Sequence, residues 1–185
     1  EATAAVLGAA GNIGQIMAQL LAPQVKKLWL IGRPGRLAQL EPLKALLSSQ
    51  INGHHHKDFS IQLSDNPEVL REVELLVTAS NAVEPLVQPD MLGRHPMVIC
   101  DISVPGDVAE TVPQLRPNVQ LIRGGIIALP QNPDFFIPGI QLPDGQLFAC
   151  MAETLLLGLE GQQTHFSMGD IRMEQLQYLT KLASK

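Results

Sequence analysis

The stretch Ala4-Ala5-Val6-Leu7-Gly8-Ala9-Ala10-Gly11-Asn12-Ile13-Gly14 decides the fold of this chain. It begins with an apolar run of the kind that a buried parallel strand needs. Apolar residues at helical spacing follow over residues 15–21, until Pro23 ends the helix. Between the two, three glycines have the spacing Gly-x-x-Gly-x-x-Gly. A strand, a glycine-rich turn and a helix in this order are typical of the first βα unit of a dinucleotide-binding domain.

The glycines meet three physical needs of a dinucleotide site. The chain must turn tightly, its backbone must approach a pyrophosphate, and the start of the helix must offer its N–H groups to the anion. The residues that we expect to contact the cofactor here are Gly8, Gly11, Asn12, Ile13 and Gly14. The alternative is a βα turn whose glycines serve the fold alone.

The loop after the second expected strand, at residues 27–32, indicates which nucleotide is bound. An NAD enzyme usually carries Asp or Glu there for the ribose hydroxyls. This chain instead has Gly32-Arg33-Pro34-Gly35-Arg36, with no carboxylate. Because guanidinium groups form charge-assisted, bidentate bonds with a 2′-phosphate, we expect NADPH as the cofactor and Arg33 and Arg36 among its ligands. Two solvated loop arginines are the alternative.

The rest of the chain alternates strands with helices. Further strands are predicted at residues 59–63, 74–78, 97–101 and 119–123. Helices are predicted at 36–49, 146–159 and 173–183, and a Pro-rich loop at 129–143. This alternation indicates an α/β fold, a Rossmann-like, doubly wound and mostly parallel sheet with flanking helices. We expect residues 1–185 to form a single NADP-binding domain with C-terminal helices. The chain opens with Glu1 almost directly before a strand, so we expect it to be cut from a longer multidomain protein.

Small residues follow two other expected strands. Thr78, Ala79 and Ser80 come at the carboxyl end of the fourth strand, where doubly wound folds bind ligands. We expect the nicotinamide ribose to lie against them, the alternative being a plain polar loop. Gly124 and Gly125 end the sixth strand and are also expected at the cofactor, where their N–H groups could steady a developing oxyanion.

Composition excludes several classes of function. Hydrophobic residues make up 45% of the 185 and charged residues 17%, which suits a packed core. The net charge of −5 leaves no basic stripe for nucleic acid or an anionic membrane surface, and aromatic residues, at 4%, are too few to stack single strands. No apolar run reaches the ~18 residues of a membrane span, and no basic-then-apolar leader opens the chain. We therefore expect a cytoplasmic protein without nucleic acid or an integral membrane segment.

A thiol is the strongest candidate nucleophile. The two cysteines, Cys100 and Cys150, are too few for a disulfide framework and suit a reducing cytosol. Cys150 lies early in an expected helix that Asp144 or Gly145 could cap. A thiolate, which a helix N-terminus favours, attacks a thioester and forms an acyl intermediate that hydride can reduce. Core packing is the alternative for Cys150, and it is the expectation for Cys100.

Other polar side chains give further candidates. His95 and His165 are candidates for acid–base work, with surface positions as the alternative. Asp101 and Asp107 could face the cleft at the end of the fifth strand. We expect no metal site, because the adjacent histidines at 54–56 diverge and no cysteine or second histidine cluster completes a ligand set.

The segment Phe148-Ala149-Cys150-Met151-Ala152-Glu153 resembles the C-terminal part of cyanobacterial long-chain acyl-[acyl-carrier-protein] reductases. The pattern of that family is a Phe-Ala-Cys helix, a Leu-Leu-x-x-Glu stretch and a Phe-Ser-x-Gly turn, which residues 155–169 continue here. The glycine turn, Arg33 and Gly124-Gly125-Ile126 also look like this family, so the similarity spans nearly the whole chain.

The resemblance implies NADPH-dependent reduction of a fatty acyl thioester, on acyl carrier protein or coenzyme A, to an aldehyde. It implies that Cys150 takes the acyl group before hydride transfer, and that a substrate domain stands upstream in the same chain. Two alternatives stay open. The Asp-x-x-Val-Pro segment at 101–105 looks like glutamyl-tRNA reductases, which favours a shikimate- or glutamyl-tRNA-reductase-like dehydrogenase with Cys150 in the core. The other is a nucleotide-binding module without turnover.

Overall fold

The chain forms two compact units. The computed structural model describes residues 2–51, 59–131 and 133–184. By its internal contacts the chain divides into a first unit, Glu1–Arg123, and a second unit, Gly124–Lys185. The expectation of a single domain over 1–185 stays a prediction. No helix in the described ranges is long and apolar enough to cross a membrane.

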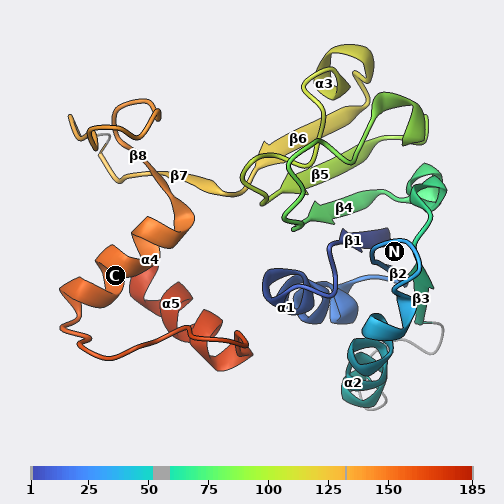
Figure 1. The fold of residues 1–185 in the computed structure, drawn as a ribbon, viewed down its shortest axis with the longest axis horizontal. Helices are drawn as coiled ribbons and strands as arrows, with labels where there is room; N and C mark the ends of the chain where they lie inside the picture. Colours follow the sequence, from blue (N-terminus) through green and yellow to red (C-terminus); the bar gives the residue numbers. More distant parts are fainter. Residues whose placement is uncertain (1, 52–58, 132, 185) are drawn as a thin grey trace. The chain divides into compact units, whose positions relative to one another are not determined.

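Six parallel strands in the order β3-β2-β1-β4-β5-β6 form the sheet of the first unit (Figure 1). They are β1 (Thr3–Leu7), β2 (Lys27–Ile31), β3 (Ser60–Ser64), β4 (Leu75–Thr78), β5 (Met97–Asp101) and β6 (Val119–Arg123). This confirms the predicted doubly wound parallel sheet, and each predicted strand is correct to within one residue at either end. Because the strand order reverses at β1, a ligand crevice is expected where β1 and β4 end side by side.

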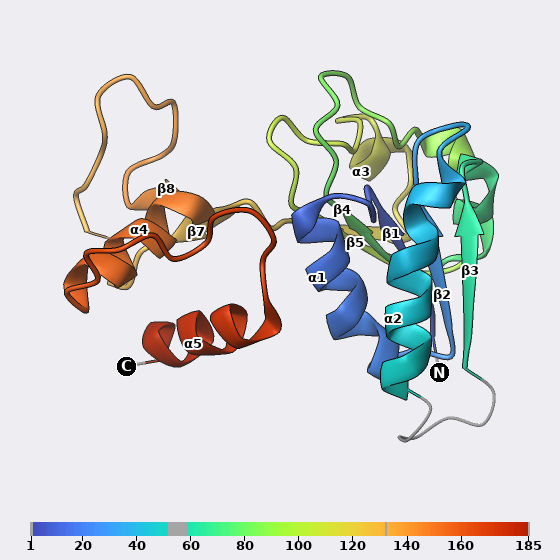
Figure 2. The same cartoon turned by 60° about the horizontal axis from the view of Figure 1, so that its bottom comes forward.

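Helices cover both faces of this sheet (Figure 2). One face carries α1 (Asn12–Leu21), η1 (Ala22–Gln24), η2 (Leu37–Leu40) and α2 (Glu41–Ile51). The other carries η3 (Pro67–Glu72), η4 (Pro89–Met91) and α3 (Val112–Leu115). Alternate residues of β1 serve the two cores: Ala4 and Val6 pack with the first set, and Ala5 and Leu7 with the second. Burial on both faces explains why β1 reads as a continuous apolar run.

One predicted helix of the first unit is shorter than expected. Residues 36–49 were expected to form one helix, but Leu37–Leu40 forms a 3-10 turn and α2 begins at Glu41. Pro42 explains the break, since proline has no N–H to donate back along an α-helix and is tolerated only in the first turn.

The second unit pairs two short strands before its helices. The strands β7 (Ile126–Ala128) and β8 (Gln146–Phe148) are antiparallel, with Ile126 opposite Phe148. They lead into α4 (Ala149–Leu159), and α5 (Met173–Ala183) has its predicted bounds. The prediction of a helix from residue 146 is wrong, because residues 146–148 pair with β7 instead. The N-cap is therefore Phe148 and not Asp144 or Gly145.

The contact between the glycine turn and α1 gives a first prediction. A Cβ at Gly14 would lie 2.8 Å from the carbonyl carbon of Gly8 and 2.9 Å from Cα of Ala9, both backbone atoms that cannot rotate away. We expect Gly14→Ala to lower the free energy of unfolding of the chain by about 2–3 kcal/mol in a urea titration. Gly11→Ala is the matched control, with an expected loss of about 1 kcal/mol or less. Equal losses would contradict this packing.

Candidate functional site

The three glycines of the turn have different roles. Gly8 has φ +81°, and a Cβ there would lie 2.5 Å from the carbonyl oxygen of Ala79. Gly14 is held equally close to the turn. The fold itself therefore requires these two glycines. Gly11 has φ −78° and ψ 160°, and the nearest atom to its Cβ would be the Gly8 carbonyl oxygen, at 3.4 Å. The fold therefore leaves room for a side chain at Gly11, and the contact of Gly11 with a nucleotide stays a prediction.

The start of helix α1 is open to an anion. Asn12 and Ile13 are exposed in its first turn, no side chain caps the helix at Gly11, and the first turn carries no acidic residue. The first N–H groups of an α-helix have no acceptor within the helix, and the helix dipole places partial positive charge there. The donor set therefore fits the pyrophosphate of a dinucleotide.

Arg33 and Arg36 follow β2 and are both exposed. One Nη of Arg33 donates to Oδ1 of Asn81, which follows β4, at 2.7 Å. Because β1 lies between β2 and β4, this bond joins the two sides of the β1 end. Asp65, after β3, accepts the N–H of Gly35 at 2.9 Å and so holds the arginine-bearing turn. Two guanidinium groups in a held turn fit a 2′-phosphate. The sequence places Asn81 directly after Thr78, Ala79 and Ser80 but does not predict its bond with Arg33, because that bond depends on the strand order.

Asp101 is a buried anchor at the carboxyl end of β5. Its side chain is 1% exposed, so the expectation that it faces a cleft is wrong. Thr78 is also buried, and its hydroxyl donates to Asp101 at 2.8 Å, while contact of Thr78 with a nucleotide stays a prediction. The remaining donors to the Asp101 carboxylate are the guanidinium of Arg123 and the N–H groups of Ser103, Asp107 and Val108. One carboxylate therefore ties the ends of β4, β5 and β6 together.

Asp107 extends this network to the loop after β4. It is fully buried rather than in a cleft, and its carboxylate accepts the N–H of Ser80 at 3.0 Å. The hydroxyl groups of Ser80 and Ser103 also donate to it. Ser80 and the neighbouring Ala79 are thus fixed beside the glycine turn, where we expect the cofactor. Both buried carboxylates accept several hydrogen bonds, as buried polar groups usually do, and Asp101 also pairs with the guanidinium of Arg123.

In the second unit, the structure brings Cys150 close to Gly125. The N–H of Ala149 donates to the carbonyl oxygen of Gly125 at 3.0 Å, which continues the β7–β8 pairing. Helix α4 begins at Ala149, so Cys150 is its second residue, and the side chain of Cys150 is exposed. Cys150 is therefore not part of the core of the second unit. An exposed thiol in the first turn of a helix has the placement of a reactive cysteine.

The other candidates have structural or surface positions. Cys100 is half-buried, and burial, followed by the nearby Asp101 carboxylate, raises the pKa of its thiol. Nε2 of His95 lies 2.8 Å from the carbonyl oxygen of Val73, before β5 and so at the opposite edge of the sheet from the glycine turn. His165 is exposed between α4 and α5. The histidines at 54–56 lie outside the described residues.

Comparison with known proteins agrees with this geometry. The profile of the family described as shikimate/quinate 5-dehydrogenase matches residues 1–123, which is the first unit. The chain belongs to the shikimate/quinate 5-dehydrogenase family. Residues 124–185, with Cys150, lie outside the matched part.

Three curated relatives match more of the chain than this family profile does. An aminotransferase, PigE, from a Serratia species is 26% identical over 98% of the chain and 20% of its own length. A long-chain acyl-[acyl-carrier-protein] reductase from Synechococcus elongatus is 26% identical over 91% of the chain and 47% of its own. A glutamyl-tRNA reductase from Thermomicrobium roseum is 28% identical over 69% of the chain and 29% of its own. The chain thus spans less than half the length of each of these relatives.

Among solved structures, a lactate dehydrogenase from Eimeria maxima, determined with NADH and oxamate, overlaps 68% of this chain and 44% of its own. The TM-score is 0.42 and the sequence identity 13%.

The two thiols should differ in reactivity. Cys150 is exposed, whereas the raised pKa of Cys100 keeps its thiol protonated to higher pH than usual. Near neutral pH we expect iodoacetamide to alkylate Cys150 at least about tenfold faster than Cys100, because the thiolate is the reacting form. Peptide mapping over a pH series measures both rates. Alkylation of Cys100 should rise only at more alkaline pH, and equal rates at neutral pH would contradict the placement of the two thiols.

Proposed function

We propose that this chain is the NADPH-binding and thiol-bearing part of a reductase that converts a fatty acyl thioester to an aldehyde. The observation that carries the proposal is the exposed Cys150 in the first turn of α4, hydrogen-bonded through its neighbour Ala149 to Gly125. The acyl donor proposed is a thioester of acyl carrier protein or of coenzyme A. The likeness to the Synechococcus reductase, which covers 91% of the chain and includes this region, supports the proposal.

The first unit holds the cofactor in this proposal. Gly11 and the first turn of α1 receive the pyrophosphate, and Arg33 and Arg36 receive the 2′-phosphate. Ala79 and Ser80, fixed by Asp107, lie against the nicotinamide ribose. When bound, NADPH supplies the hydride that reduces the acyl group.

Cys150 performs the acyl transfer. Its thiolate attacks the carbonyl carbon of the thioester, the carbon–sulfur bond to the carrier breaks, and the carrier leaves as its thiol after taking a proton. After reduction of the acyl group, the bond to Sγ of Cys150 breaks, the aldehyde leaves and the thiolate returns. The N–H groups of Gly124 and Gly125 donate to no described residue, so they are available to the oxyanion that forms in each step.

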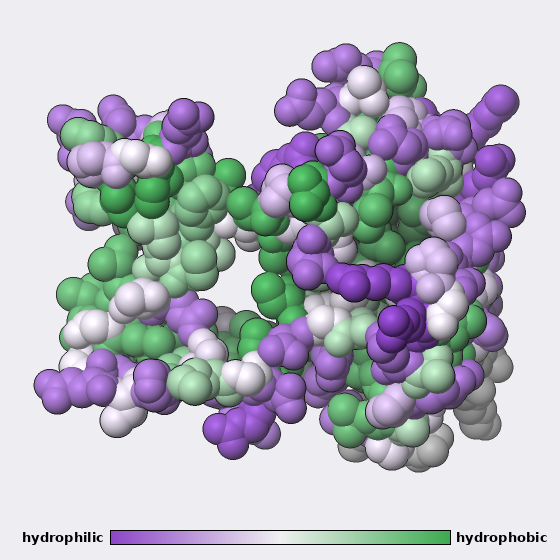
Figure 3. Space-filling model, in the orientation of Figure 1, coloured by the Kyte–Doolittle hydropathy of each residue, from purple (hydrophilic) through white to green (hydrophobic). Residues whose placement is uncertain are grey.

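The surface of the second unit suits an apolar substrate. Figure 3 shows hydrophobic side chains over much of it. Leu155 is 48% exposed and Leu159 85% on α4, and Phe136 and Met168 are exposed by 66% and 71%. Exposed apolar side chains in such number are typical of binding surfaces, and a fatty chain would cover them.

A second candidate is a dehydrogenase of the shikimate or glutamyl-tRNA reductase type, in which Cys150 has no part. Two observations favour it. The family match covers residues 1–123 without Cys150, and the chain is 28% identical to a glutamyl-tRNA reductase over 69% of its length. Formation of an acyl-enzyme distinguishes the two candidates.

The nucleotide preference tests the cofactor assignment. We expect Arg33→Gln to raise the dissociation constant for NADPH by about 10- to 100-fold, the loss of one charge-assisted contact with the 2′-phosphate, and to leave that for NADH unchanged. Calorimetric titration measures both. The matched control is Lys26→Gln, an exposed cation before β2 at the other edge of the sheet. Equal losses for both nucleotides would contradict a 2′-phosphate contact.

Turnover tests the role of Cys150. With a long-chain acyl thioester and NADPH, Cys150→Ser should form no aldehyde and oxidise no NADPH, while its NADPH affinity stays within about twofold, because the thiol acts on the acyl group alone. Cys100→Ser is the control and should keep its activity. Aldehyde formation by Cys150→Ser would overturn the mechanism. NADPH binding without any oxidation by the unsubstituted chain would favour a nucleotide-binding module without turnover.

A further inference from the structure

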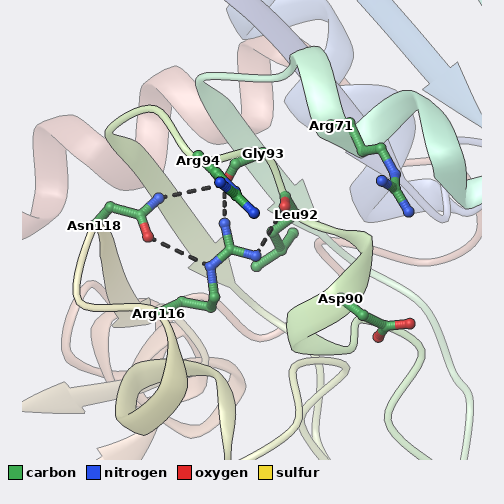
Figure 4. Close-up of a pocket in the computed structure, with 7 residues that line it drawn as sticks. All are labelled: Arg71, Asp90, Leu92, Gly93, Arg94, Arg116 and Asn118. Carbon is green, nitrogen blue, oxygen red and sulfur yellow. Dashed lines mark hydrogen bonds between the residues drawn. The ribbon is translucent and has the colours of Figure 1, made fainter.

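A cavity lies at the edge of the sheet opposite the glycine turn. Its volume is about 700 Å³, within the range of small-molecule sites. It is lined by Arg71, Asp90, Leu92, Gly93, Arg94, Arg116 and Asn118 (Figure 4). Most of these residues come shortly before β4, β5 or β6, whereas the candidate cofactor residues follow their strands. Because the strands are parallel and rise about 3.3 Å per residue, the two sites are separated by roughly 15 Å of sheet.

A partly buried hydrogen-bond network holds the walls of this cavity. The guanidinium of Arg116 donates to the carbonyl oxygens of Pro89, Leu92 and Gly93. Asn118 donates to the carbonyl oxygen of His95 at 2.6 Å. Figure 4 shows the guanidinium of Arg116 beside Leu92, Gly93 and Asn118. Because the N–H groups of Arg116 donate to backbone carbonyl oxygens, Arg116 contributes positive charge to the cavity but has few N–H groups left to bind a ligand.

The other two arginines, unlike Arg116, keep their guanidinium groups exposed. Arg71, on η3, and Arg94, on the turn before β5, are exposed, and neither guanidinium donates to a residue in the described part of the chain. In that part the ion pairs join Lys27 to Glu72 and Arg123 to Asp101, so neither Arg71 nor Arg94 forms an ion pair. Asp90 is the one acidic residue of the lining.

The cavity therefore concentrates positive charge on a protein of net charge −5. Three guanidinium groups stand against one carboxylate, and two of the three retain all their donors. A guanidinium group can donate two parallel hydrogen bonds to one phosphate or carboxylate. Two such groups, from Arg71 and Arg94, can therefore bind a molecule that carries two of these anionic groups. The lack of a side chain at Gly93 allows the segments around it to lie close together, because a Cβ there would collide with the carbonyl oxygen of Arg71 and the ring of His95.

We propose that this cavity is an anion site, separate from the nucleotide site, which binds a small molecule with at least two phosphate or carboxylate groups through Arg71 and Arg94. The site needs neither the cofactor nor Cys150, so the proposal stands apart from the reductase proposal.

Backbone amide NMR of the chain tests this site directly, because the signals of residues 92–94 and 118 report on the cavity alone. The probes are inorganic pyrophosphate and citrate, each titrated at constant ionic strength to remove general screening. We expect at least one probe to shift these signals saturably. Pyrophosphate alone would identify a phosphate site, citrate alone a carboxylate site, and both a general oxyanion site.

Variants decide the roles of the arginines. Arg71→Gln with Arg94→Gln should weaken the binding about tenfold or more, whereas Lys26→Gln, an exposed cation near the same sheet edge, should not change it. Asp90→Asn should strengthen the binding severalfold, which keeps the test decisive if the double variant folds poorly. Absence of saturable shifts, shifts unaffected by the double variant, or an equal loss in Lys26→Gln would overturn the proposal.

Discussion

The close packing of α1 and of the loop after β4 against the glycine turn at the end of β1 determines where the functional groups of the first unit lie. Gly14, in the first turn of α1, packs against the turn at Gly8, and Gly8 packs against the carbonyl group of Ala79. A side chain at either glycine would push α1 or the loop after β4 away. Because neither Gly8 nor Gly14 has a side chain, the positive end of the α1 dipole and the loop at Ala79 both lie next to the glycine turn. The adjacent strand β2 then brings Arg33 to the same edge.

The sequence predicts most of this unit because its signals are local. Apolar runs, alternation and glycine spacing locate all six strands and α1. Burial on both faces leaves a continuous apolar run in a central strand such as β1, whereas β3, with the sequence Ser-Ile-Gln-Leu-Ser, alternates between apolar and polar residues. The turn at Arg33 is likewise a local feature. The 3-10 turn before α2 could have been inferred from Pro42, whose missing N–H breaks the helix.

Features that depend on distant pairing could not be read from the sequence. Residues 146–148 have an apolar pattern that suits the start of α4, and only their partner β7 makes them a strand. Asp101 and Asp107 look like loop carboxylates at a cleft, but five donors from three strand ends surround Asp101. The cavity at Arg116 is similar, because its donors bind carbonyl groups more than 20 positions away in the chain.

The proposed chemistry assigns one task to each unit: Gly124–Lys185 forms the acyl-enzyme and Glu1–Arg123 binds the reductant. Mass spectrometry of the intact chain after mixing with a long-chain acyl thioester, without NADPH, tests this account most directly. The account predicts the added mass of one acyl group, mapped to Cys150 and removed when NADPH is added. No added mass, or an acyl group mapped to Cys100, would contradict it.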